Sequence, residues 1–316
     1  MLNRWKRGLW VGVSVCVLAL GLALGSTSAS GAKAPTPVGG GLYVGDKPLL
    51  GVGKEAWDVS GILKLTDGSL LTWGYADPLT KEQQFVKRST DAGANWQDVA
   101  MPGSAKGKGY FRFWREGDRL YAWGESGLWL SRDQGSQWKS VWKGGRKTTS
   151  LDVQGRKIAV VTDGVLQVSA DEGQHFTKLE APKETSRAAF DADGTIYAQV
   201  MNKVYDLHAG KWNRVNGSFF TKTGGHVITF DPQGVYMWVN DHTVTYEYPT
   251  AKRSAERLIL LGDRLYLLSE DKLYARSLNP DEPWSTVELP NQGSLIGLEQ
   301  APGGDLYYAF GAKLPV

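Results

Sequence analysis

Short runs of alternating apolar and polar residues recur along the chain beyond residue 40. Examples are residues 120–124 (Leu-Tyr-Ala-Trp-Gly), 158–161 (Ile-Ala-Val-Val) and 265–268 (Leu-Tyr-Leu-Leu). A period of two, with many β-branched and aromatic residues, predicts half-buried strands, whereas a helix would place apolar residues every three to four positions. The chain is therefore expected to be all-β.

Turn dipeptides divide the predicted strands into repeats of four. The first hairpin of each repeat is expected to turn at residues 67–68, 116–118, 154–155, 193–194, 233–234, 262–263 and 304–305. The corresponding first strands are predicted to begin near Asp58, Tyr110, Ser150, Arg187, His226, Arg257 and Ser294. Two strands remain at the N-terminus, near 41–45 and 49–52, and the chain ends about two strands into the seventh repeat. Pairing these four strands would close a ring and leave no open sheet edge.

One motif, Ser-x-Asp-x-Gly-x-x-aromatic, recurs at residues 89–96, 131–138 and 169–176, with a degenerate copy at 277–284. Its predicted structural residues are Ser89, Asp91, Gly93, Trp96, Ser131, Asp133, Gly135, Trp138, Ser169, Asp171, Gly173, Phe176, Ser277 and Trp284. With Trp212 included, the closing aromatics are 42, 38, 36 and 72 residues apart, which places a hidden copy near Tyr248. A period of this length with several strands per repeat is typical of β-propeller blades.

The predicted fold is a single seven-bladed β-propeller of four-stranded antiparallel blades. Its N- and C-terminal strands share one blade. Six or eight blades are the alternatives.

The motif resembles the Asp-box (BNR) repeat of sialidases, sortilin-type receptors, some glucanases and propellers like the photosystem II assembly factor. This resemblance implies the architecture but not an activity, because these proteins differ widely in function. Asp91, Asp133 and Asp171 are expected to accept backbone N–H groups within the turns, and the aromatics to pack between blades. The three aspartates are therefore predicted to be scaffold residues and not catalytic ones.

The first 34 residues combine a basic start, an apolar run over residues 9–25 and a small-residue exit, which is the pattern of a secretory signal peptide. We expect a signal peptide at 1–34, a linker at 35–41 and the propeller at 42–316; an uncleaved membrane anchor is the alternative for the first segment. General secretion to the periplasm, cell surface or medium is predicted. Without residues 1–34, Lys+Arg falls from 36 to 32 while Asp+Glu stays at 33, so the net charge changes from +3 to −1. Nucleic acid is therefore not an expected partner.

Catalytic and metal motifs are weak. The Arg-Ile-Pro sequence expected of a sialidase is missing, and its nearest match is residues 111–114. Arg112, Arg187 and Arg257 are predicted to lie at different depths in the propeller, which would prevent them from meeting on one carboxylate. The four histidines have no metal-ligand spacing, so neither a metal nor another cofactor is expected.

Basic residues concentrate in the loops that join the last strand of one blade to the first strand of the next. These loops hold 12 basic residues against the four acidic residues Glu55, Glu180, Glu184 and Glu256. Focused charge attracts anionic partners. The predicted binding residues are Lys106, Lys108, Lys143, Arg146, Lys147, Arg187, Lys252, Arg253 and Arg257, together with Phe219 and Phe220, which are expected to project from the same loops. Lys222 is assigned to these loops as well.

The sequence thus favours an extracytoplasmic, non-catalytic and monomeric binding or assembly protein. Its basic rim would bind an acidic protein segment or an anionic polymer. The alternative is a glycan-active enzyme, such as a sialidase-like glycoside hydrolase, or a lectin, with a central pocket.

Overall fold

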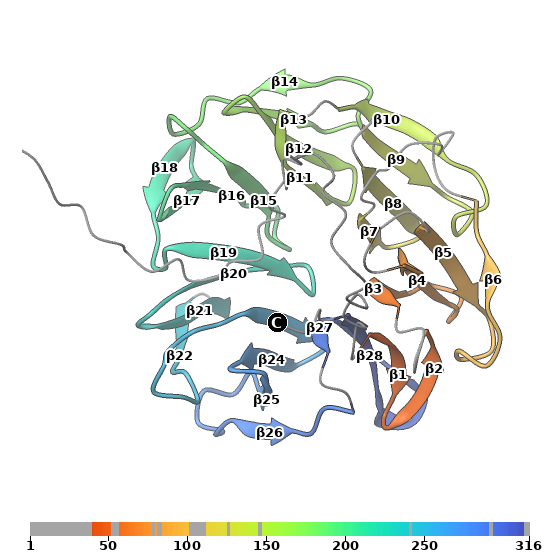
Figure 1. Ribbon diagram of the computed structural model, residues 1–316. Coiled ribbons are helices and arrows are strands. Elements are labelled where there is room, and N and C mark those ends of the chain that lie inside the picture. Colours follow the sequence, from red (N-terminus) through yellow and green to blue (C-terminus); the bar gives the residue numbers. More distant parts are fainter. Residues whose placement is uncertain are drawn as a thin grey trace, which may run out of the picture.

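The computed structural model describes residues 40–51, 57–77, 80, 84–100, 112–124, 127–144, 147–239, 242–290 and 293–312. Within them the chain forms seven four-stranded antiparallel sheets, arranged as blades around one axis (Figure 1). This arrangement confirms the predicted seven-bladed β-propeller. The first strand of each blade, A, lies innermost and the fourth, D, outermost.

The blades follow the order of the chain. Blade 1 consists of β3 (Asp58–Lys64), β4 (Leu70–Tyr75), β5 (Gln84–Ser89) and β6 (Gln97–Asp98). Blade 2 consists of β7 (Arg112–Glu116), β8 (Arg119–Gly124), β9 (Gly127–Ser131) and β10 (Lys139–Lys143). Blade 3 consists of β11 (Thr148–Gln154), β12 (Lys157–Thr162), β13 (Val165–Ser169) and β14 (Thr177–Lys178). Blade 4 consists of β15 (Arg187–Phe190), β16 (Ile196–Val200), β17 (Lys203–His208) and β18 (Lys211–Arg214).

The remaining blades complete the ring. Blade 5 consists of β19 (Phe219–Thr223), β20 (His226–Asp231), β21 (Gly234–Val239) and β22 (His242–Tyr246). Blade 6 consists of β23 (Arg257–Leu261), β24 (Arg264–Ser269), β25 (Lys272–Ser277) and β26 (Ser285–Val287). Blade 7 consists of β27 (Ser294–Gln300), β28 (Leu306–Gly311), β1 (Gly41–Val44) and β2 (Lys47–Leu50), with a 3₁₀ turn at Pro302–Gly304.

Blade 7 joins the two ends of the described chain. β1 pairs antiparallel with β28, from Gly41 opposite Phe310 to Val44 opposite Tyr307. In Figure 1 the orange N-terminal strands lie beside the blue C-terminal strand. The shared blade predicted from the leftover strands is therefore present, and it closes the ring by pairing N-terminal with C-terminal strands.

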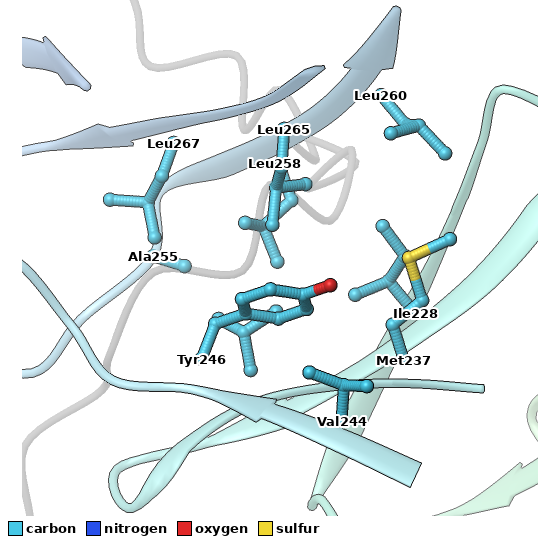
Figure 2. Packing of buried hydrophobic residues seen from close by; sticks show 10 residues of the cluster. Ile228, Met237, Val244, Tyr246, Ala255, Leu258, Leu260, Leu265 and Leu267 are labelled. Carbon is cyan, nitrogen blue, oxygen red and sulfur yellow. The ribbon is translucent and has the colours of Figure 1, made fainter. Parts of the chain in front are cut away.

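The core consists of apolar layers between neighbouring blades. Figure 2 shows the layer between blades 5 and 6, where the buried Tyr246 ring lies among aliphatic side chains of both sheets. Its hydroxyl donates to the backbone oxygen of Leu278 in the next blade, at 2.9 Å. Pairing of the hydroxyl removes the cost of burying a polar group within this layer.

Each complete Ser-x-Asp-x-Gly-x-x-aromatic turn lies between strands C and D and has the same hydrogen bonds. In the first, the Ser89 hydroxyl donates to Asp91 (2.7 Å) and accepts from the Gly93 N–H (2.8 Å). Asp91 also accepts the backbone N–H of Asn95 at 2.8 Å. Gly93 has a φ of 95°, a left-handed conformation that favours glycine. These turns are rigid connections made by their own side chains.

Blade 5 differs from the sequence-based prediction. His226 begins strand B and not strand A, because the A–B turn is at Gly224–Gly225. The Gln233–Gly234 dipeptide, which the sequence assigns to the A–B turn, belongs to the B–C connection. Tyr248 follows strand D, so the motif copy expected there is absent. Strands C and D of blade 5 are joined by a short connection, from Val239 to His242, and blades 6 and 7 again begin at the predicted residues Arg257 and Ser294.

Candidate functional site

The two faces of the propeller carry different sets of turns. Because successive antiparallel strands reverse direction, the A–B and C–D turns share one face, which we call the box face. The D–A loops and the B–C turns share the opposite face, which we call the rim face. The basic residues predicted in the D–A loops therefore share the rim face with the residues of the B–C turns.

Three arginines gather where the central channel opens on the rim face. Arg112, Arg187 and Arg257 are each the first residue of an innermost strand, β7, β15 and β23, in alternate blades. They therefore lie at the same level along the axis, and the predicted difference in their depths is wrong. We call these residues the mouth arginines.

No carboxylate forms an ion pair with a mouth arginine within the described part of the chain. Burial, with the nearby charge of Arg112, lowers the pKa of Arg187 to about 10 and lowers the pKa of Arg257, while the charge of Asp152 acts on Arg187 in the opposite direction. The Arg187 Nη1 donates to the backbone oxygen of Phe220 at 3.0 Å, and its guanidinium lies 4.8 Å from the Phe220 ring. Neither Arg112 nor Arg257 forms an ion pair with a described residue. Three guanidinium groups that repel one another form a site prepared for an anion.

The box-face end of the same channel is occupied by a buried ion cluster. Lys222 of β19 extends to β11, where its Nζ lies 3.0 Å from an Asp152 carboxylate oxygen and 2.7 Å from the Val153 backbone oxygen. Glu116 of β7 lies 3.8 Å from the same Nζ. Burial raises the pKa of Asp152 and of Glu116, while Lys222 acts in the opposite direction. Lys222 therefore crosses the inside of the ring, and its assignment to a D–A loop is wrong.

The two phenylalanines predicted to project from the rim lie in strand β19. Phe220 is 2% exposed and packs in the layer between blades 4 and 5. Phe219 is partly buried, with its ring 6.0 Å from that of Phe230. The prediction that they project is wrong because blade 5 begins one strand earlier than the sequence indicated.

The outer part of the rim is partly neutralised. Lys147 pairs with Asp163 at 3.2 Å, and Lys252 lies 3.7 Å from Glu270. Both acids lie in B–C turns. The charge balance predicted from the sequence included only the D–A loops of this face. Lys143 and Arg253 are exposed. Lys106, Lys108 and Arg146 lie outside the described residues.

The prediction from the sequence did not place the three mouth arginines in one site. Arg187 and Arg257 were predicted to bind, whereas Arg112 was considered only for a sialidase site. The sequence signal that could have grouped them is their shared position, because each begins strand A of its blade and the three blades alternate around the ring.

Other kinds of site find no support in the described ranges. No group of three His, Cys, Asp or Glu residues there is arranged to hold a metal ion. No helix there is long and apolar enough to cross a membrane.

Comparisons with known proteins identify the class as a β-propeller. Neither a family model nor a curated protein matches the sequence. YCF48 from Cyanidioschyzon merolae superposes with a TM-score of 0.51 at 12% identity, over 80% of this chain and 95% of that one. A structure titled YCF48 bound to D1 peptide gives 0.55 at 11% identity, over 81% and 92%. The extracellular domain of BT4673 from B. thetaiotaomicron gives 0.58 at 9% identity, over 81% of this chain and 40% of that one. At these identities the similarity establishes the fold.

Proposed function

We propose that this chain is a non-catalytic binding or assembly propeller of the Asp-box class that works outside the cytoplasm. An acidic protein segment would dock on its rim face. The observation that carries the proposal is the set of mouth arginines, none of which forms an ion pair with a described residue, although Asp152 partly offsets the charge of Arg187. A desolvated, unpaired charge costs stability, and its retention is explained if a ligand supplies the missing anion.

A protein segment fits this site better than a nucleic acid. Pairs such as Lys147–Asp163 reduce the positive charge of the outer rim. Duplex phosphates would need an extended basic stripe. The solved structure of YCF48 with the D1 peptide supports a peptide partner for a propeller of this shape.

Export is part of the proposal. Residues 1–34 would direct secretion, with 35–41 as a linker and 42–316 as a monomeric propeller; a retained apolar segment would instead tether it. The extracellular domain of BT4673 and PorZ, described as a surface component of the type-IX secretion system of Porphyromonas gingivalis, support such a location. Strand β1 begins on the rim face, where β28 ends. A tether would therefore hold the rim face toward the membrane.

The buried acids of the channel support a non-catalytic role. A glycoside hydrolase needs two carboxylates that face its substrate. Asp152 is bound by the Lys222 ammonium and by the Phe190 N–H at 2.8 Å, and Glu116 lies beside the same ammonium. These contacts commit both acids to the ion cluster.

The proposal is tested by affinity capture from envelope extracts with three baits. They are the wild-type propeller, the mouth variant Arg112→Gln/Arg257→Gln and the rim variant Lys147→Gln/Lys252→Gln. Neither mouth residue donates a hydrogen bond to a described residue, so the mouth variant should be at least as stable as the wild type. The proposal predicts a partner that wild type and rim variant retain at low salt and the mouth variant loses. A partner retained equally by all three baits would contradict it.

A further inference from the structure

The Ser-x-Asp-x-Gly-x-x-aromatic turns pack closely against the outermost strand of the preceding blade. A Cβ on Gly93 would lie 2.7 Å from a Leu49 methyl carbon of β2, and a Cβ on Gly173 would lie 2.6 Å from the Val141 backbone oxygen of β10. Contacts this short exclude a side chain at the glycine position. Glycine therefore allows these two turns to fit closely against their neighbours, whereas a Cβ on Gly135 would lie 3.5 Å or more from other atoms and only its φ of 95° favours glycine.

The degenerate sixth turn cannot fit in this way. Asp281 occupies its glycine position and Asn279 its aspartate position. Arg276 organises the turn by donating through Nη2 to the backbone oxygens of Asn279 (2.9 Å) and Pro280 (2.8 Å). Where this turn faces strand β22 of blade 5, the structure has a groove of about 580 Å³. The groove therefore lies beside the one of these turns in which Asp281 replaces the glycine.

Aromatic side chains form part of the groove. Tyr248, Tyr274 and Trp284 line it, and each is partly buried. The Trp284 indole N–H donates to the Glu247 backbone oxygen at 2.7 Å, which ties blade 6 to blade 5 along the groove. Fixed aromatic faces of this kind provide stacking surfaces at small entropic cost.

Polar groups of both kinds complete the lining. Arg276 is only 6% exposed, and its guanidinium lies 4.7 Å from the Tyr246 ring and 5.4 Å from the Trp284 ring. Its Nε and Nη2 donate to backbone oxygens, whereas Nη1 has no acceptor among the described residues. Exposed carboxylates of Glu247, Asp281 and Glu282 also line the groove and offer acceptors.

We propose that the groove between blades 5 and 6 binds a neutral saccharide. The aromatic faces would stack on the C–H face of a sugar ring, Arg276 Nη1 would donate to a hydroxyl or ring oxygen, and the three carboxylates would accept hydrogen bonds from hydroxyl groups. The carboxylates disfavour an anionic ligand and the buried guanidinium disfavours a cationic one. The volume lies within the usual range of small-molecule sites, about 300–1,000 Å³. This site is separate from the mouth arginines and does not depend on the function proposed for them.

The test uses saturation-transfer NMR with a panel of neutral sugars at about 10 mM, since weak single-site binding has dissociation constants near the millimolar range. The panel contains glucose, galactose, mannose, N-acetylglucosamine and N,N′-diacetylchitobiose, with galacturonate and glucosamine as charged analogues. We expect saturation of at least one neutral sugar and a weaker signal from its charged analogue.

A pair of variants locates the binding. Thr245→Trp would fill the groove from the exposed side of β22, whereas Thr243→Trp lies two residues away on the same face and outside the lining. Neither threonine is buried, so both variants should fold. The proposal predicts that Thr245→Trp loses at least 10-fold in affinity while Thr243→Trp keeps wild-type binding. It is overturned if no neutral sugar binds, if the charged analogues bind better, or if the two variants behave alike.

Discussion

At the scale of single residues, the motif aspartates stabilise the turns through their ionised carboxylates. Backbone and side-chain hydrogen bonds from Asn95, with the Ser89 hydroxyl, lower the pKa of Asp91 from 3.8 to about 2. Because the folded-state pKa lies below the unfolded value, this stabilisation is present above pH 3.8 and is lost as the pH falls toward 2. Asp91→Asn should therefore flatten the pH dependence of the unfolding free energy in this range. Urea titrations at several pH values measure this pH dependence, with Asp118→Asn at an exposed aspartate as the control. If the unfolding free energy of both variants changed equally with pH, the stabilising role of the Asp91 carboxylate would be contradicted.

Glu299 should show the opposite pH dependence. Burial on strand β27 raises its pKa from 4.5 to about 7, and contacts with Lys64 and Arg115 only partly offset this. The unfolded chain ionises at lower pH, so stability falls as the pH rises from 4.5 to 7. Glu299→Gln should remove this fall and raise the unfolding free energy at pH 8 by about 1–3 kcal/mol. Denaturation curves at pH 4.5 and 8 test it, and a variant less stable than wild type at pH 8 would refute it.

At the scale of elements, the shared blade makes the N-terminal strands essential to the closed ring. β1 pairs with β2 on one side and with β28 on the other. Deletion of residues 35–52 should therefore lower the melting temperature by roughly 10 °C or more, since a 1 kcal/mol loss shifts a domain of this size by about 2–4 °C and several hydrogen-bonded pairs are removed. Differential scanning calorimetry measures it, with deletion of residues 1–34 as the control. An unchanged melting temperature after the longer deletion would show that the ring does not depend on this closure.

The elements were predictable where the repeat is regular and unpredictable where it is not. Blades 1 to 3 carry complete turns, so their spacing places each strand. Blade 5 lacks such a turn and contains two glycine-bearing turns, at Gly224–Gly225 and 233–234, of which only the structure identifies the first as the A–B turn. That single shift also misplaced Phe220 and Lys222.

At the scale of the whole molecule, the seven-bladed ring and part of the surface charge pattern could be predicted from the sequence. It could not show which loops share a face with which turns, so the pairing of Lys147 with Asp163 and of Lys252 with Glu270 was missed. Nor could it show that Arg112, Arg187 and Arg257 meet around the axis, because this depends on the common level at which innermost strands begin. The groove between blades 5 and 6 is lined by residues of both blades, so the degenerate motif alone could not predict it.

The central claim is that the mouth arginines, and not the outer rim, attract an anionic partner. It is tested most directly by the association rate constant of a fluorescent hexaglutamate peptide, measured by stopped flow at about 20 mM and 150 mM salt, where the screening length shrinks to roughly 8 Å. We predict steep slowing with salt for wild type and, at low salt, association about 10-fold slower for Arg112→Gln/Arg257→Gln. The control Lys147→Gln/Lys252→Gln should stay within about twofold of wild type, because its charges are already paired on the surface. A mouth variant as fast as wild type, or a control slowed to the same degree, would contradict the account.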